Sequence, residues 1–149
     1  MIRKARLPDA RAIHQLLIGY AREGLMLPRP LSEIFEAIRD FYVFEDGERV
    51  VGTVSLHICW DDLAEVRSLA VAADQEGRGV GRALVESCLE EARVLGLKRV
   101  FALTYKPGFF AKLGFHEIEK SELPQKIWGD CLKCAKFPDC DEIALIRMI

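Results

Sequence analysis

A layered domain of the α/β or α+β class is the architecture that this sequence predicts. Short apolar runs typical of strands alternate with amphipathic stretches typical of helices, and no linker, repeat or low-complexity tract separates them. Of the 149 residues, 50% are hydrophobic and 30% are charged, a balance typical of globular proteins. Because this length lies near the commonest domain size, we expect residues 1–149 to form a single domain.

The first expected elements are a strand over residues 2–6 and a helix that begins at Pro8-Asp9. Proline suits the first turn of a helix, because the N–H that it lacks would have no partner there. Gly24 marks the end of this helix, since glycine readily adopts the left-handed conformation that often follows one. The apolar stripe of the helix comprises Ile13, Leu16, Leu17 and Tyr20.

A short second helix and a β-hairpin are expected next. Ser32 is the expected N-cap of the helix, because its hydroxyl can accept a hydrogen bond from the first turn. Strands over residues 41–44 and 50–58, joined by a turn at Asp46-Gly47, form the expected hairpin. The apolar face of the second helix would consist of Phe35 and Ile38.

The second half of the chain begins with a strand over residues 63–71, which leads into a glycine-rich loop. A helix over residues 82–95 follows the loop, and Gly96 closes it. Its inward face would comprise Leu84, Val85, Cys88, Leu89 and Ala92. The remaining expected elements are a strand over 99–103, a short helix over 109–113 and a last strand over 143–149.

The glycine-rich loop is the most informative motif. Gly77, Gly79 and Gly81 remove three side chains at the point where a strand turns into a helix. Exposed N–H groups and the partial positive charge of a helix N-terminus suit a phosphate or pyrophosphate, although a plain glycine-rich turn is the alternative. The alternating spacing fits neither a P-loop nor the Gly-x-Gly-x-x-Gly motif of a Rossmann fold.

Two segments resemble motifs of the GNAT acetyltransferases. The run from Glu76 to Gly81 resembles their acetyl-CoA-binding motif Gln/Arg-x-x-Gly-x-Gly/Ala, from which Glu76 departs at the first position. The run from Phe109 to Phe115 resembles the helix Phe-Tyr-x-x-x-Gly-Phe of the same family. Phe110 stands where many members carry a tyrosine that is the proposed acid for the departing thiolate, and phenylalanine cannot donate that proton.

The resemblance implies an α+β fold of three layers, in which helices flank a twisted, mostly antiparallel sheet. Strands four and five splay apart, here over residues 63–71 and 99–103, and acetyl-CoA lies between them with its pyrophosphate on the glycine loop. The backbone N–H of Leu69 would polarise the acetyl carbonyl, and Val71 would hold the pantetheine arm. The cofactor-binding residues implied are Leu69, Ala70, Val71, Glu76, Gly77, Arg78, Gly79, Val80, Gly81, Arg82 and Phe110.

A narrower resemblance concerns the acceptor. Residues 25–29, 64–71 and 101–105 are similar to the acetyltransferase domain of N-acetylglutamate synthases, which acetylate the α-amine of L-glutamate in arginine biosynthesis. The tail over residues 123–145 resembles their short bacterial form, which lacks the amino-acid-kinase domain. The resemblance therefore implies L-glutamate as the acceptor and direct transfer of the acetyl group.

Two carboxylates on the acceptor call for cationic partners, and arginine binds carboxylates bidentately. By resemblance, Arg29 and the main chain around Leu27 and Ser68 would hold the α-carboxylate. Arg67 or Lys126 would meet the side-chain carboxylate.

Strand alternation places Arg67 on the same face as Glu65, unless a bulge intervenes. Glu65 is the candidate general base, because its strand is apolar enough to be largely buried. A structural ion pair with Arg67 is the alternative role for this carboxylate. Thr104 and Tyr105 are the candidate acids for the CoA thiolate. The three histidines lack the spacing of metal ligands, and no catalytic role is assigned to His57.

The five cysteines form two groups. Cys59 and Cys88 lie in apolar segments, where small buried side chains are expected. Cys131, Cys134 and Cys140 offer three thiolates for zinc but no obvious fourth ligand, so a metal site, a redox pair and plain structural cysteines all remain open. No metal is assigned.

Charge, hydropathy and the N-terminal residues bear on the partners and the cellular location. A net charge of −2 gives no reason to expect a nucleic-acid partner, and no apolar run is long enough for a membrane span. Because no apolar signal-peptide core follows the N-terminus, a cytoplasmic location is expected. Dimers are common in the family, so a homodimer is compatible with the resemblance. An acetyltransferase for another small or protein amine, and a non-catalytic acetyl-CoA-binding module, are the alternatives.

Overall fold

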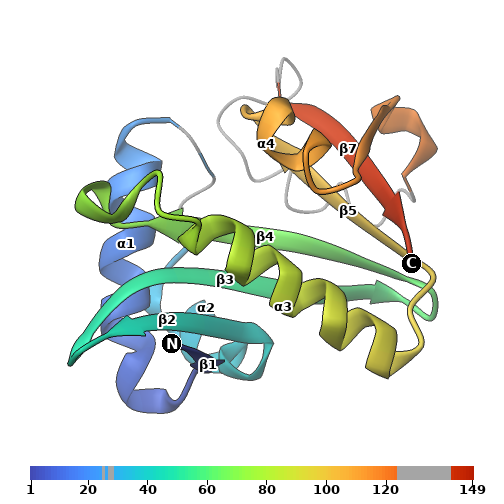
Figure 1. Cartoon of the computed structure of the whole chain (residues 1–149). Coiled ribbons are helices and arrows are strands. Elements are labelled where there is room, and N and C mark those ends of the chain that lie inside the picture. The colour runs from blue at the N-terminus through green and yellow to red at the C-terminus, as the bar shows by residue number, and fades with distance from the viewer. Residues whose placement is uncertain (25, 27–28, 124–141) are drawn as a thin grey trace.

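The computed structural model describes residues 1–24, 26, 29–123 and 142–149, which form a seven-stranded sheet with helices on both faces (Figure 1). The strand order is β1-β2-β3-β4-β5-β7-β6. The strands are β1 (Ile2–Lys4), β2 (Phe41–Asp46), β3 (Arg49–Trp60), β4 (Leu63–Val71), β5 (Arg99–Thr104), β6 (His116–Ile118) and β7 (Ile143–Met148). The helices are α1 (Ala10–Arg22), α2 (Leu31–Glu36), α3 (Val80–Leu95) and α4 (Pro107–Ala111), with 3₁₀ turns η1 (Leu7–Asp9), η2 (Ile38–Asp40), η3 (Ala73–Gln75) and η4 (Lys120–Glu122).

Strands β4 and β5 are the parallel neighbours in this sheet, and the other pairs are antiparallel. Their pairing covers only Leu63–Glu65 of β4 and Arg99–Phe101 of β5. Beyond these residues the two strands diverge, so that β5, β7 and α4 lean away from β4 and α3 (Figure 1). The expected α+β fold with a splayed, mostly antiparallel sheet is confirmed.

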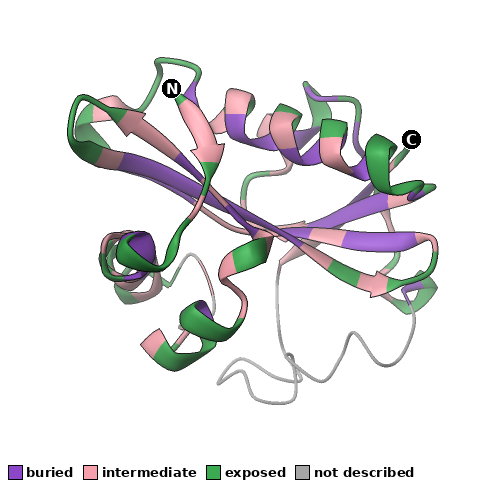
Figure 2. Cartoon of the chain, turned by 90° about the horizontal axis from the view of Figure 1, so that it is seen from below, coloured by how far each residue is buried: buried purple, intermediate pink, exposed green. Residues whose placement is uncertain are grey.

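The sheet is covered by separate apolar clusters on its two faces. Leu84, Leu89 and other residues of α3 pack against β3 and β4 on one face. Ile13 and Leu17 of α1, with Ile34 of α2, pack on the opposite face. Figure 2 shows buried residues running along the strands between these helical layers. Among the described residues, no helix is both long and apolar enough to cross a bilayer.

The amphipathic pattern predicted α3 and β4 well. The inward residues expected for α3 are all buried, and Gly96 closes the helix with a φ of 83°. Strand β4 has the bounds that the sequence predicted. The helix itself begins at Val80, earlier than expected, because Gly79 occupies the N-cap position.

Three local expectations are wrong or incomplete. Pro30, not Ser32, is the N-cap of α2, and Ile34 is the buried residue (1% exposed) where Phe35 was expected (37% exposed). The hairpin turn is centred on Gly47-Glu48, because Asp46 still pairs with Arg49. The short strand β6, paired with β7, was not predicted, since three residues carry too little pattern to be recognised.

Gly52 allows α3 to approach β3 closely. A Cβ atom at this position would lie 2.9 Å from both Leu84 Cδ1 and Val80 Cγ1, in a packed core. We expect Gly52→Ala to lower the free energy of unfolding by about 1–3 kcal/mol, measured by urea denaturation. Gly19→Ala in α1 is the matched control: its Cβ would meet nothing within 4 Å, and a gain of about 0.5–1 kcal/mol is expected there. Equal effects of the two substitutions would contradict this account of the β3–α3 contact.

Candidate active site

A β-bulge in β4 shapes the site. Thr53 of β3 pairs with Ala70, but Ser55 pairs with Arg67, so β4 carries an extra residue between these pairs. Ser68 is the residue of the bulge with a left-handed backbone: its φ is 58°, an uncommon conformation for a residue with a side chain. The alternation of faces is thereby shifted beyond Ser68.

The shift decides where the side chains of β4 point. Leu69 and Val71 join the core beneath α3, and Ala70 packs toward α1. Glu65 and Arg67 share a face, as strand alternation predicted, and both line a cavity. The strand thus presents apolar groups at one end of the cavity and charged groups at the other.

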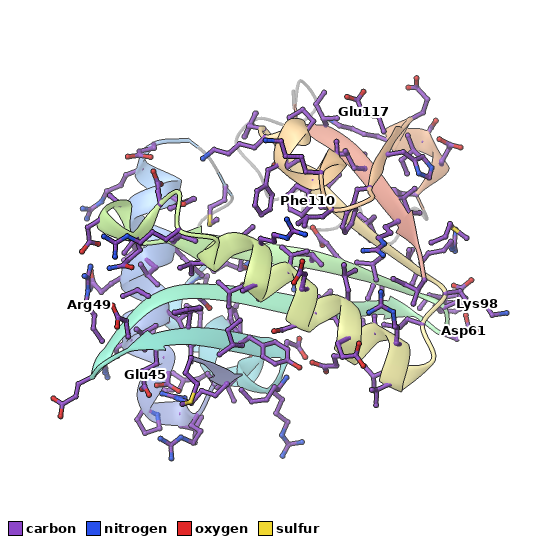
Figure 3. The ribbon with its side chains drawn as sticks, in the orientation of Figure 1. Glu45, Arg49, Asp61, Lys98, Phe110 and Glu117 are labelled. Carbon is purple, nitrogen blue, oxygen red and sulfur yellow. The ribbon has the colours of Figure 1, made fainter. Side chains whose placement is uncertain are left out.

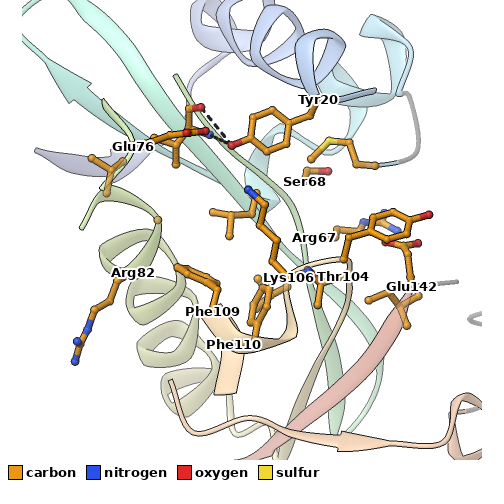
Figure 4. A pocket seen from close by; sticks show the side chains of 18 of the residues that line it. Tyr20, Arg67, Ser68, Glu76, Arg82, Thr104, Lys106, Phe109, Phe110 and Glu142 are labelled. Atoms are coloured by element: carbon orange, nitrogen blue, oxygen red, sulfur yellow. Dashed lines mark hydrogen bonds between the residues drawn. The ribbon is translucent and has the colours of Figure 1, made fainter. Parts of the chain in front are cut away.

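The cavity has a volume of about 450 Å³ and lies between the diverging β4 and β5 (Figure 4). Its walls come from α1, β4, the glycine loop, the first turn of α3, β5 and α4. Predicted site residues that line it are Arg29, Glu65, Arg67, Ser68, Leu69, Val71, Glu76, Gly77, Gly79, Val80, Gly81, Arg82, Thr104, Tyr105 and Phe110. Further lining residues that the sequence did not single out are Tyr20, Met26, Val66, Gln75, Leu103, Lys106, Phe109 and Glu142.

The glycine loop opens the N-terminus of α3 toward the cavity. Gly77 and Gly79 have φ values of 78° and 80°, which glycine adopts without strain, and Gly79 is the N-cap. At Gly81 a Cβ atom would lie 3.4 Å from Phe109 Cζ, so the loop and α4 fit closely. The 16-residue helix α3 supplies unpaired N–H groups and partial positive charge at this end, which suits a phosphate or pyrophosphate.

Helix α4 contributes an aromatic wall. The rings of Phe109 and Phe110 meet edge to face at 5.1 Å, and Phe110 and Phe115 do so at 5.2 Å. Figure 3 shows Phe110 between the α3 side of the molecule and the β5–β7 side. Because these rings carry no proton donor, this wall can hold an apolar chain but cannot protonate a leaving group.

Tyr20 reaches the open edge of β4 from α1. Its hydroxyl donates to the Val71 carbonyl at 3.3 Å and accepts from the Val71 N–H at 3.2 Å (Figure 4). Tyr20 thus fixes α1 to the strand that forms the cavity wall. The sequence showed Tyr20 only as a member of an apolar helical stripe, and nothing in that pattern distinguished its hydroxyl.

Charged groups gather at the end of the cavity where β4 and β5 begin to separate. Arg67 Nη1 lies 3.7 Å from Glu65 Oε1, and the two side chains are 17% and 12% exposed. Arg29 Nη1 lies 3.5 Å from Glu33 Oε2, and Arg29 lines the same cavity. The ion pair that was the alternative role for Glu65 is therefore present, and it places a carboxylate and a guanidinium together in the cavity.

The loop after β5 carries the two candidate acids. Thr104 Oγ1 accepts a hydrogen bond from the Lys106 N–H at 2.9 Å, which leaves its hydroxyl proton to be donated elsewhere. Tyr105 lines the cavity beside it. Figure 4 shows Thr104, Phe110 and Lys106 near one another, on the side of the cavity opposite Tyr20.

Some predicted site residues lie elsewhere. The Ala70 side chain is buried against α1 and Arg78 is exposed, and neither lines the cavity. Leu27, Lys126 and the three cysteines Cys131, Cys134 and Cys140 lie outside the described residues.

Two cysteines belong to the part of the chain that the structure describes. Cys59 is half-buried and Cys88 is buried. Burial raises the pKa of the Cys88 thiol to about 12, so the thiol stays protonated at neutral pH and behaves as an apolar group. No cluster of His, Cys, Asp or Glu side chains suited to a metal ion occurs within residues 1–24, 26, 29–123 and 142–149.

Comparison with known proteins identifies the family and supports the fold. The model of the acetyltransferase (GNAT) family matches residues 10–115. The chain belongs to the GNAT acetyltransferase family. It is 45% identical to an uncharacterized N-acetyltransferase of Chlorobaculum tepidum, over 99% of this chain and 96% of that protein. It is 39% identical to an amino-acid acetyltransferase of Mycobacterium tuberculosis, over 87% of this chain and 76% of that protein.

Solved structures of similar proteins have the same fold. A Mycobacterium tuberculosis protein crystallised with CoA superimposes with a TM-score of 0.85 at 33% identity, covering 100% of this chain and 99% of that one. N-acetylglutamate synthase of Neisseria gonorrhoeae, complexed with coenzyme A and N-acetyl-glutamate, gives a TM-score of 0.90 at 26% identity. That match covers 99% of this chain and 34% of the synthase chain.

The protein is therefore an acetyl-CoA-dependent acetyltransferase. Gly77 and Gly79 have the positive φ values that glycine adopts readily, and the loop that they form precedes the N-terminus of α3, an arrangement that suits a phosphate group. The aromatic wall of α4 and the apolar part of β4 offer a surface for the pantetheine arm. Acetyl-CoA supplies an activated acetyl group, and the residues of the chain supply its position.

We expect Gly79→Ala to weaken the binding of CoA about tenfold, because a methyl group at this left-handed position costs about 1–2 kcal/mol and shifts the loop. Isothermal titration calorimetry with CoA measures the change.

Gly47→Ala is the matched control for backbone strain. Gly47 has a φ of 65° with nothing within 4 Å of its Cβ position, and it does not line the cavity. Both variants should lose comparable stability, while only Gly79→Ala should lose CoA affinity. Unchanged CoA affinity in Gly79→Ala would show that the loop does not hold the pyrophosphate.

Proposed function

We propose that the protein transfers the acetyl group of acetyl-CoA to the α-amine of L-glutamate, as an N-acetylglutamate synthase of arginine biosynthesis. The observation that carries the proposal is the charged lining of the cavity, which includes Arg29, Arg67 and Glu65, with Arg67 Nη1 3.7 Å from Glu65 Oε1. The names of relatives support it, since an amino-acid acetyltransferase and an N-acetylglutamate synthase are among them.

The charged end suits an amino acid with two carboxylates. Arg29 and the backbone near Ser68 would hold the α-carboxylate, and Arg67 would meet the side-chain carboxylate. Each guanidinium offers a planar pair of donors that matches a carboxylate. The carboxylates of Glu33 and Glu65 lie 3.5 and 3.7 Å from these guanidinium groups and keep them in place.

Glu65 would act as the general base, directly or through a water. Its carboxylate is 12% exposed and lies beside Arg67 at the end of the cavity that would receive the ammonium group. Removing a proton from the ammonium generates the nucleophile, and the Leu69 N–H would polarise the acetyl carbonyl. Because Phe110 cannot supply a proton to the thiolate, Thr104, Tyr105 or a water would do so.

A thiol-release assay with acetyl-CoA and single amino acids tests the acceptor. We expect glutamate to be acetylated faster than glutamine, which lacks the second carboxylate, and faster than aspartate, whose side chain is one methylene shorter. Turnover of another amine in preference to glutamate would keep the acetyltransferase and overturn this acceptor.

Arg29→Ala should raise the KM for glutamate by roughly 10- to 100-fold, since a hydrogen bond to a charged group contributes about 1.5–3 kcal/mol. The KM for acetyl-CoA should stay unchanged. Arg93→Ala is the control, because Arg93 pairs with Glu90 on the exposed end of α3. A rise in both KM values, or none in either, would argue against a carboxylate-binding role for Arg29.

Glu65→Gln should lower kcat by about 10²–10⁴-fold, the range typical for loss of a general base, and the loss should be smaller at high pH, where the amine is deprotonated without help. The pH profile of kcat measures this. Glu117→Gln is the control, since Glu117 is exposed on β6 and does not line the cavity. If the glutamine variant kept the activity and pH profile of the parent protein, Glu65 would be only an ion-pair partner of Arg67.

A further inference from the structure

His57 lies directly across the sheet from Glu65. Strands β3 and β4 pair antiparallel with His57 opposite Glu65 and Ser55 opposite Arg67. Side chains of directly opposed residues stand on the same face with Cβ atoms about 4.5–5.5 Å apart. His57 is therefore the neighbour of Glu65 on the side away from the cavity, whose lining includes Glu65 but not His57.

Asp40 holds His57 from the other side. The Asp40 Oδ2 atom, at the end of η2, lies 3.6 Å from His57 Nδ1. The His57 and Asp40 side chains are 39% and 32% exposed, compared with 12% for Glu65. His57 and Asp40 are thus both more accessible to water than Glu65, which lies at the cavity.

We infer that His57, oriented by Asp40, carries the proton that Glu65 removes from the acceptor amine out to solvent. The inference rests on the proposed role of Glu65. His57 acts through Glu65 and does not touch the substrate, so it is a positioning and relay residue. Because histidine exchanges protons near neutral pH, it is the side chain best suited to this place.

The proton balance is simple. An N–H bond of the acceptor ammonium breaks, and its proton passes to the Glu65 carboxylate. Glu65 then passes the proton to the His57 ring, whose Nδ1 faces Asp40, and the ring releases a proton to water. Glu65 and His57 return to their starting states, and no electrons are transferred. Asp40 and Glu65, carboxylates from η2 and β4, flank the imidazolium and stabilise its transient charge.

The arrangement also gives the proton on Glu65 a path to water. With the acceptor and acetyl-CoA bound, the cavity beside Glu65 would be occupied, and His57 would offer the proton a second way to water. The route through β3 runs across the sheet instead. Turnover would then not depend on opening the cavity for the proton to leave.

The test compares kcat of the parent protein and His57→Gln at constant pH, at low and high concentrations of imidazole buffer. Glutamine keeps the size and polarity of the side chain but cannot relay a proton. We expect kcat of His57→Gln to fall roughly tenfold at low buffer, with both KM values unchanged, and to recover as imidazole accepts the proton in its place. Asp40→Asn should show a smaller loss with the same recovery.

His116→Gln is the matched control, because His116 is exposed on β6 and does not line the cavity. Its kcat should equal that of the parent protein at every buffer concentration. A loss in His57→Gln that imidazole does not reverse, or no loss at all, would overturn the relay. Such a result would leave His57 and Asp40 as a structural contact between η2 and β3.

Activity of the parent protein separates this inference from the proposed acceptor. If glutamate is acetylated and His57→Gln is unaffected, the relay fails and the acceptor stands. If another amine is acetylated instead, the acceptor fails and the buffer experiment is made with that amine, because the relay needs only an amine proton. If Glu65→Gln is fully active, Glu65 is not the base, and the relay through His57 is overturned as well.

Discussion

The site depends on the early end of the pairing between β4 and β5. Over Leu63–Glu65 the strand pairs with both β3 and β5, and beyond that point it keeps only β3. The freed edge would be a row of unsatisfied peptide groups if nothing covered it. Tyr20 meets the Val71 peptide there, and the divergence leaves the cavity between β4 and β5.

The bulge at Ser68 divides this strand into two chemical regions. Before the bulge, Glu65 and Arg67 face the layer of α1 and α2, and after it Leu69 and Val71 turn their side chains toward α3. A regular strand would have placed Ser68 on the α3 face in their stead. One extra residue therefore separates the charged acceptor end from the apolar cofactor end, and the left-handed φ of Ser68 is the local conformational cost.

Patterns of period and composition predicted the parts of the fold that depend on local sequence. The helical repeat of α3, the bounds of β4 and the glycine loop could all be found in this way, and family resemblance supplied the splayed strands. The N-cap of α2 could not, because capping preference favours Ser32, whereas the helix begins at Leu31 after Pro30 without a side-chain cap. Only packing decides between Ile34 and Phe35 as the buried residue.

Of the neighbours of Glu65, the sequence predicted Arg67 but not His57. Arg67 follows two residues later on the same strand, so strand alternation predicted it. His57 lies opposite Glu65 through the pairing register of β3 and β4, which no local sequence pattern shows. The contact of Tyr20 with Val71 likewise depends on tertiary packing. Sequence spacing shows which residues share an element, whereas a pairing register shows which residues from different elements face each other.

The groups of the proposed proton route and the aromatic wall of the cavity come from different elements of the fold. The wall formed by α4 carries Phe109 and Phe110, and Phe110 stands where the resemblance implies a tyrosine in many family members, so this wall offers no acid or base. The ionisable groups Glu65, His57 and Asp40 stand instead on β4, β3 and η2, across the sheet. A thiolate is a good leaving group and needs little help from a donor, whereas an ammonium must lose its proton before it can attack. The distribution of side chains therefore matches the step that requires a base more closely than the step that requires an acid.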